Sequence, residues 1–432
     1  MPIVNSRGEV LNENDLRALE NMLRGSLENH RDRAQQTEDL GLDEDLFDPS
    51  INAFNDAAGG LAKAIKKAAK SKKTVSVDDF INQTFGNVFE KIRKKTDFAS
   101  DDAGEYLNMC AIQWGEPNLV RKVVNNPEYE PDYKDTPQAY QNTVEDFKFA
   151  DEPFKGIEEI ETVDIENGSF ASLEEGRAGS SSTLAADLDE LRKAVENAPD
   201  NSQERKNAQK ELEKTEKAKM GHHMGCEMSR MYADDLKDKK QVSFGDVYNA
   251  FASLNEAARP GDKDAGKLRG KFVAVPNRLE GVGSVYVPGQ LYKTMDIIAQ
   301  GINRIKSESD NPSLQKTHAI QLASFASQML ISQHVFNDAN GRTCRMFADT
   351  ILQTFGLPPH IPPKEVDPKL EPKNSFGTIG TKLAFDWGAN YIFDGVKRSN
   401  AVLQETKQKE AERKSEQVKE ISFNTFSANL QN

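Results

Sequence analysis

Apolar residues recur every three or four positions along much of the chain, the spacing that places them on one face of an α-helix. In the first hundred residues this pattern predicts helices over residues 16–27, 61–73 and 77–92, with an acidic loop over residues 39–48 that ends at Pro49. The stretch 61–73 is rich in lysine. We interpret it as the solvated face of a helix bundle rather than a membrane-surface or partner-binding helix, because it is short and its neighbours are acidic.

The same spacing continues in the second half of the chain. Residues 184–195 carry an apolar stripe, residues 197–200 (Asn-Ala-Pro-Asp) interrupt it, and residues 203–219 are almost entirely charged or polar. This order predicts a helical hairpin that is inserted at about residues 180–220 and projects from the core. Further helices are predicted at residues 243–254, 290–306, 322–330, 346–355 and 385–403.

One stretch has the pattern of strands instead. Residues 270–275 (Gly-Lys-Phe-Val-Ala-Val) and 284–289 (Ser-Val-Tyr-Val-Pro-Gly) flank a loop that contains Pro276 and Gly281. Apolar and β-branched residues on both sides of a turn-rich loop predict a β-hairpin. The expected fold class is therefore mostly α, with a small β-hairpin.

Proline marks the least regular part of the chain. Five prolines fall between residues 117 and 153, where apolar periodicity is weak, and this is typical of an irregular linker. We therefore divide the chain into a helical N-terminal region of unknown role at residues 1–120, a linker at 121–154, a core at 155–400 and a charged C-terminal tail at 401–432.

Composition and net charge exclude some classes of function. The chain has 432 residues and a formal net charge of −13, which disfavours a general nucleic-acid or anionic-membrane binder. Cys110, Cys226 and Cys344 have no metal-ligand spacing among themselves and indicate a reducing compartment. His222 and Cys226 are one helical turn apart, but two ligands make an incomplete metal site, so a structural role is favoured. No membrane span or export signal is recognised, so we expect a cytoplasmic protein, or one delivered into a host cell by a specialised secretion system.

Candidate chemistry is concentrated in residues 331–345, which read Ile-Ser-Gln-His-Val-Phe-Asn-Asp-Ala-Asn-Gly-Arg-Thr-Cys-Arg. Asn340 and Gly341 tolerate left-handed backbone angles, so successive N–H groups can point into one concavity that fits an anion. Arg342 and Arg345 share a face of the first turn of the following helix, where cations oppose the helix dipole. A polyanionic ligand would explain these arginines. The stretch is therefore a candidate phosphate site with an imidazole, His334, beside it.

This stretch resembles the signature of the Fic family, HxFx(D/E)(G/A)N(G/K)RxxR, and every defining position is filled. Fic proteins transfer a phosphate-containing moiety, most often AMP from ATP, to a protein hydroxyl. The resemblance implies that His334 is the general base for a Ser, Thr or Tyr hydroxyl and that Phe336 anchors the loop in the core. It implies that Asp338 holds the Mg²⁺ that bridges the α- and β-phosphates. These roles suit a displacement at phosphorus, which needs positioning, charge neutralisation and a base with a pKa near 7.

The remaining motif residues would bind the nucleotide. Asn340 and the backbone at Gly341 would cradle phosphate oxygens next to Ala339, while Arg342 and Arg345 would bind the outer phosphates. Many family members have glycine where this chain has Ala339, and the alanine variant also occurs in members that use nucleotides other than ATP. The resemblance therefore leaves the donor open.

A second resemblance lies upstream. Residues 162–167 are similar to the inhibitory motif (S/T)xxxE(G/N) of many Fic proteins, with Thr162, Glu166 and Asn167 at the matching positions. Thr162 and Glu166 would share one helical face, and the glutamate would pair with an arginine of the signature and occupy the γ-phosphate position. The resemblance thus implies an enzyme restrained by an N-terminal inhibitory helix.

The expected fold is a Fic-type helical core with a hairpin flap, and the expected activity is AMP transfer from Mg-ATP to a protein hydroxyl. Transfer of UMP, phosphocholine or phosphate, removal of AMP from modified proteins, and a catalytically silent interaction protein stay open as alternatives. The hairpin 271–287 resembles the family's flap, which pairs with a target segment by strand addition. A target protein is therefore the expected partner, no nucleic-acid partner is expected, and homo-oligomerisation is left open.

Overall fold

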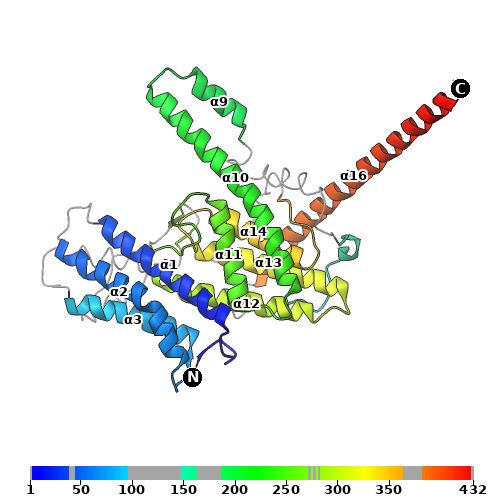
Figure 1. Cartoon of the computed structure of the whole chain (residues 1–432). Coiled ribbons are helices and arrows are strands. Elements are labelled where there is room, and N and C mark those ends of the chain that lie inside the picture. The colour runs from blue at the N-terminus through cyan, green and yellow to red at the C-terminus, as the bar shows by residue number, and fades with distance from the viewer. Residues whose placement is uncertain are drawn as a thin grey trace.

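The structure is a computed structural model in which most of the folded core is described. The described residues are 2–37, 44–95, 147–162, 186–270, 274–275, 279–280, 283–362 and 382–429. Within them the fold is mostly α-helical (Figure 1).

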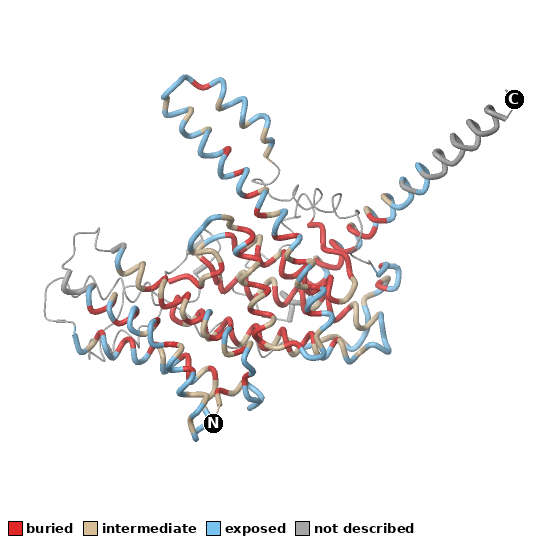
Figure 2. Tube along the Cα trace, in the orientation of Figure 1, coloured by how far each residue is buried: buried red, intermediate tan, exposed pale blue. Residues whose placement is uncertain are grey.

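The core is built around α13 (Pro312–Gln333), which packs against α12 (Val287–Lys306), α14 (Asn340–Thr354) and α16 (Lys382–Asn429). Two further helices, α10 (Gln203–Asp238) and α11 (Phe244–Ala258), pack against α14 and against each other. Buried residues concentrate where these helices meet (Figure 2). Each core helix buries an apolar face against its neighbours, so its apolar residues recur at helical spacing. This is why the spacing in the sequence predicts these helices.

The N-terminal region forms three helices, as the apolar spacing predicts. They are α1 (Glu13–Thr37), α2 (Glu44–Ala69) and α3 (Val77–Lys95). Two short strands, β1 (Ile3–Val4) and β2 (Val75–Ser76), pair in parallel beside them. Their buried apolar residues belong to the same cluster as those of the core helices, so the region packs directly on the core.

Helix α2 corrects one expectation. It begins at Glu44 and runs through Pro49, so the predicted loop does not extend to Pro49, and the lysine-rich stretch is the end of this helix. Phe54, Ala58 and Leu61 are buried at helical spacing. Burial of this stripe stabilises the helix that contains Pro49. The proline has no N–H, so it removes one backbone hydrogen bond near the N-terminal end of α2.

Helices α9 (Leu188–Asn197) and α10 form the helical hairpin that the charged stretch predicts. The hairpin extends away from the core, as does the distal part of α16 (Figure 1). No residue of α9 is buried. The inner half of α10 is embedded between α11 and α14, so a single helix connects the hairpin to the core.

The β-hairpin predicted from residues 270–275 and 284–289 is not seen as expected. Strand β3 (Ala274–Val275) pairs antiparallel with β4 (Leu279–Glu280), but the expected second strand at 284–289 is helical. Residues Ser284–Tyr286 form a 3₁₀ helix, η3, and α12 begins at Val287 with Pro288 in its first turn. Proline has a backbone angle that is already helical and no N–H to satisfy there, so it initiates a helix better than it ends a strand.

The junction between α13 and α14 has an unusual backbone. His334, the residue after α13, has φ 47°, and Ala339, the residue before α14, has φ 61°. Among the described residues, Asn201 is the other non-glycine residue with positive φ. Left-handed angles at two non-glycine residues in one short turn are costly, and such strain concentrates at functional sites.

We predict that Ala339→Gly stabilises the protein. The left-handed angle costs an L-residue about 1–2 kcal/mol, which glycine avoids, whereas glycine loses about 0.4–1 kcal/mol through its freer unfolded chain. The unfolding free energy, measured by denaturant titration, should rise by about 0.5–1 kcal/mol. The matched control Ala348→Gly, inside α14, should lower it instead. If both variants are destabilised to the same extent, the strain at Ala339 is not real.

Candidate functional site

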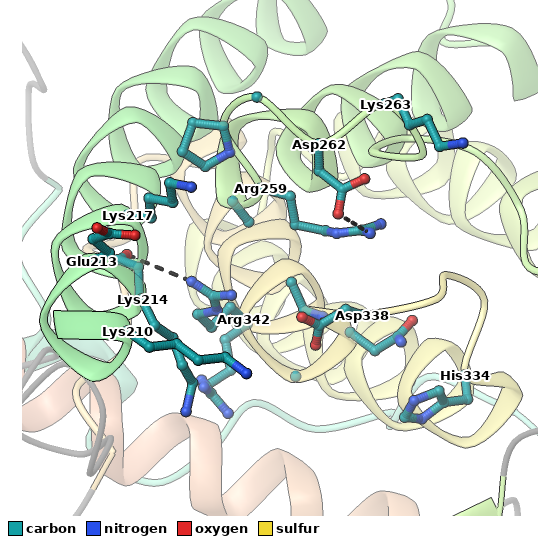
Figure 3. A pocket seen from close by; sticks show the side chains of 18 residues that line it. Lys210, Glu213, Lys214, Lys217, Arg259, Asp262, Lys263, His334, Asp338 and Arg342 are labelled. Carbon is teal, nitrogen blue, oxygen red and sulfur yellow. Dashed lines mark hydrogen bonds and ion pairs between the residues drawn. The ribbon is translucent and has the colours of Figure 1, made fainter. Parts of the chain in front are cut away.

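A cavity of about 960 Å³ opens at the junction between α13 and α14. Its lining comes from this junction, from α10 and from residues 258–263, which are the last residue of α11 and the loop after it (Figure 3). The volume lies at the upper end of the range for small-molecule and cofactor sites. The cavity therefore has room for a nucleotide-sized ligand.

The N-terminus of α14 is a candidate anion-binding site. The Thr343 N–H donates to the Ala339 carbonyl at 2.9 Å, which closes the first helical turn. The preceding N–H groups, those of Asn340, Gly341 and Arg342, have no intrahelical acceptor in such a turn, and the N-cap residue, Ala339, makes no capping hydrogen bond with its side chain. Free N–H groups and the positive end of the helix dipole favour phosphate here.

The Asn340 side chain is used to hold the loop. Its Oδ1 accepts from the Phe336 N–H at 2.9 Å, and its Nδ2 donates to the Phe336 carbonyl at 2.8 Å. Phe336 itself is fully buried, with its ring 5.0 Å from that of Phe251. The resemblance assigns Asn340 to phosphate oxygens; in this arrangement its side-chain amide also holds the Phe336 backbone, and its backbone N–H lies at the start of α14.

Asp338 supplies the carboxylate of the turn. It lies between His334 and Arg342 at the cavity (Figure 3), and its Oδ1 accepts from the Ala339 N–H at 2.6 Å. From behind, the Asn255 amide donates to the Asp338 carbonyl and to the Thr343 hydroxyl, each at 3.1 Å. One carboxylate beside a phosphate site fits Mg²⁺, which is commonly bound by one or two carboxylates together with substrate phosphates.

His334 faces the same cavity from the end of α13. Burial lowers the pKa of its imidazole below the ordinary 6.5, the Arg269 cation lowers it further, and Asp338 opposes the shift. Arg269 is fully buried. It donates from Nε to the His334 carbonyl at 2.6 Å and from Nη2 to the Gln333 carbonyl at 3.2 Å. The same residue therefore caps α13 and adds to the effect of burial in lowering the pKa of the imidazole.

The two motif arginines line the cavity beside the helix N-terminus. Arg342 donates from Nη1 to the Ala218 carbonyl of α10 at 3.5 Å. Burial lowers the pKa of Arg342, Asp338 opposes that shift, and the like charge of Arg259 adds to it. Partly buried like charges at a positive helix end cost stability unless an anion joins them.

The structure thus brings most predicted site residues together and leaves the others apart. The residues that line the cavity are His334, Asp338, Ala339, Asn340, Gly341, Arg342 and Arg345. Thr162 is exposed and is not part of the lining. Glu166 and Asn167 lie outside the described residues, so the predicted inhibitory contact stays a prediction.

Sequence reasoning missed several residues of the site. Arg269 and Asn255 act through contacts with residues about 65 to 88 positions away, which no local pattern reveals. Lys210, Lys214 and Lys217 of α10 also line the cavity. Their spacing on one face of a charged helix was the available signal, but a charged helix is more often a solvated one.

Two other expectations concern metal and membrane. His222 Nε2 and Cys226 Sγ are 3.8 Å apart. Within the described ranges, no group of three or more His, Cys, Asp or Glu side chains could hold a metal ion. In that same part of the chain, no helix combines the length and the apolarity needed to span a bilayer.

Comparisons with known proteins agree with the motif. Protein adenylyltransferase Fic of Drosophila erecta is 32% identical over 81 residues, which are 19% of this chain and 16% of the fly protein, so the chain matches about a sixth of that relative. The orthologue of Drosophila persimilis gives the same identity and coverage.

Similar solved structures include a Fic domain containing signaling protein from Bacteroides thetaiotaomicron, at 14% identity and a TM-score of 0.35. That comparison covers 63% of this chain and 96% of the bacterial one. Scores this low carry no argument about activity. Residues 241–352 match the model of the Fic/DOC family, and this stretch contains α11 to α13 and nearly all of α14. The chain therefore contains a Fic/DOC family domain with distant homology to protein adenylyltransferase Fic.

Proposed function

We propose that this protein transfers AMP from Mg-ATP to a Ser, Thr or Tyr hydroxyl of a target protein. The observation that carries the proposal is one cavity that joins a neutral imidazole, a carboxylate, an anion-binding helix end and two arginines. Phosphoryl-group chemistry asks a protein mainly for positioning and charge neutralisation, with a base for the incoming hydroxyl. The distant homology to protein adenylyltransferase Fic supports AMP as the transferred group.

Each residue then has a defined task. His334 takes the proton of the target hydroxyl, whose oxygen forms a bond to the α-phosphorus while the bond from that phosphorus to the bridging oxygen of the β-phosphate breaks. Pyrophosphate leaves with the electron pair, and the products are AMP-protein and pyrophosphate. The N–H groups at the start of α14, with Arg342 and Arg345, hold the phosphates in line. Mg²⁺ held by Asp338 would neutralise phosphate charge when bound.

The paired strands β3 and β4 are the proposed docking element for the target. The chain just before them is fixed to the catalytic turn, because the Arg269 N–H donates to the Val335 carbonyl at 3.0 Å and Leu268 forms an isolated bridge with Phe336. A segment that adds to this hairpin by strand pairing would therefore present its hydroxyl close to His334.

We predict that His334→Ala abolishes labelling of proteins by ATP that carries a label on its α-phosphate. Among the described residues that line the cavity, His334 is the one histidine, and losing a general base typically costs 10²- to 10⁴-fold in rate. Thermal unfolding should change only modestly, since the half-buried imidazole lies at the end of α13 and lines the cavity. His223→Ala, an exposed histidine outside the cavity, should label like the wild type. Labelling by His334→Ala at the wild-type rate would show that His334 is not the general base.

A second prediction concerns pH. The pKa of His334 is lowered below 6.5, so the neutral base persists to lower pH than in a free imidazole and is lost as pH falls through its folded-state pKa. The acid limb of kcat/KM should therefore have its midpoint below 6.5. Arg269→Gln removes the neighbouring positive charge and should move that midpoint to higher pH. Arg269→Lys keeps the charge and should not. Equal shifts in the two variants would show that packing, and not charge, sets the pKa.

The third prediction concerns restraint by Glu166. If its carboxylate pairs with Arg345, it fills the space of the γ-phosphate and turns the α-phosphate away from the hydroxyl. A charge-assisted pair contributes about 1.5–3 kcal/mol, so Glu166→Gly should raise labelling by roughly tenfold to a hundredfold. Glu158→Gly, which removes an exposed acid nearby, is the control. Unchanged labelling by Glu166→Gly would mean that the motif resemblance at residues 162–167 has no regulatory meaning.

A further inference from the structure

Three lysines of α10 line the cavity in a row. Lys210, Lys214 and Lys217 are spaced four and three residues apart, which places them on one helix face over roughly 10 Å of its length. With them the cavity has seven cationic and three acidic side chains, a surplus of four positive charges in a chain whose net charge is −13. The row is therefore part of a concentrated cationic surface.

The row is unfavourable for the helix by itself. Like charges three or four residues apart destabilise a helix, and Glu213, three residues after Lys210 and four before Lys217, offsets this only in part with one negative charge against three positive ones. Glu211 pairs with Lys214 at 3.4 Å, whereas Glu216 points to Arg192 of α9 at 3.1 Å. Within the part of the chain that the structure describes, no ion pair includes Lys210 or Lys217. An anion in the cavity would supply the missing partner.

The row is held at a fixed place relative to α14. Gly221 lets α10 approach α11 closely, since a Cβ there would lie 2.8 Å from the Ala258 carbonyl oxygen. The Ser229 hydroxyl donates to the Met346 carbonyl of α14 at 3.1 Å. Arg342 adds its contact with the Ala218 carbonyl, one residue beyond the row. These contacts fix the inner half of α10, and the row continues directly from it.

The position of the row within the cavity decides which phosphate it can bind. Figure 3 shows the lysines at one end, His334 at the other and Arg342 between them. The imidazole marks the reacting phosphorus, so the lysines lie beyond the leaving phosphates. We propose that Lys210, Lys214 and Lys217 form a subsite for the outermost phosphate of the donor and select nucleoside triphosphates over diphosphate donors. This rests on the proposed function, because that function sets which end of the donor reacts.

The test measures binding of ATP, ADP, CDP-choline and inorganic triphosphate by calorimetry at one ionic strength, with Mg²⁺ present. The variant is Lys210→Gln with Lys217→Gln. The control is Lys237→Gln with Lys240→Gln, which removes two exposed charges from the far end of α10 and the residues after it. Screened lysine–phosphate pairs are modest, so we expect affinity for ATP and triphosphate to fall about three- to tenfold in the variant and to hold in the control. ADP and CDP-choline should bind the wild type more weakly and change less than twofold.

The outcomes separate the subsite from the proposed function. Lysine-dependent binding of triphosphate without any AMP transfer would support the subsite and remove the proposed function. AMP transfer with unchanged ATP affinity in the variant would remove the subsite alone. Tighter binding of CDP-choline than of ATP would also overturn the subsite. So would weaker labelling of a target protein by the variant with unchanged ATP binding, because it would show that the lysines contact the target protein and not the nucleotide.

Discussion

The turn between α13 and α14 depends on buried polar side chains that satisfy its backbone from behind. Arg269 binds the carbonyls that α13 leaves open, Asn340 binds both polar groups of the Phe336 backbone, and Asn255 binds the Asp338 carbonyl. Unpaired buried backbone groups would cost about 1–3 kcal/mol each. With these groups paired internally, the left-handed turn is stable and its remaining N–H groups face the cavity.

The N-terminal region supports the same turn indirectly, through residues 268 and 284. The Asn29 amide of α1 donates to the Leu268 carbonyl at 2.6 Å, and the His30 Nε2 lies 2.9 Å from the Ser284 hydroxyl. Burial lowers the pKa of His30 to about 4, so this imidazole is neutral at physiological pH. Residues 268 and 284 flank the β3–β4 segment. Helix α1 therefore holds both ends of the segment proposed to meet the target.

Much of the helical fold could be predicted from sequence because its apolar stripes repeat locally. The motif residues could be predicted because the stretch that resembles the Fic signature is contiguous, so the cavity-lining residues among 334–345 come from one short segment. Arg269 could not, since its partners are about 65 residues away and become neighbours only when the fold forms. The start of α12 was misjudged because Val-Tyr-Val fits both a strand and a short buried helical turn, and only the following proline separates the two.

Helix α10 has 36 residues, so it is roughly 54 Å long. Its inner half is packed in the core and its outer half carries α9, with the lysine row near the boundary between them. Each residue inserted or deleted between the row and Gly221 would rotate the lysines by about 100° around the helix axis. Each such change would also shift them by about 1.5 Å along the axis, so the length of this stretch, as well as its sequence, sets where the lysines stand relative to the cavity.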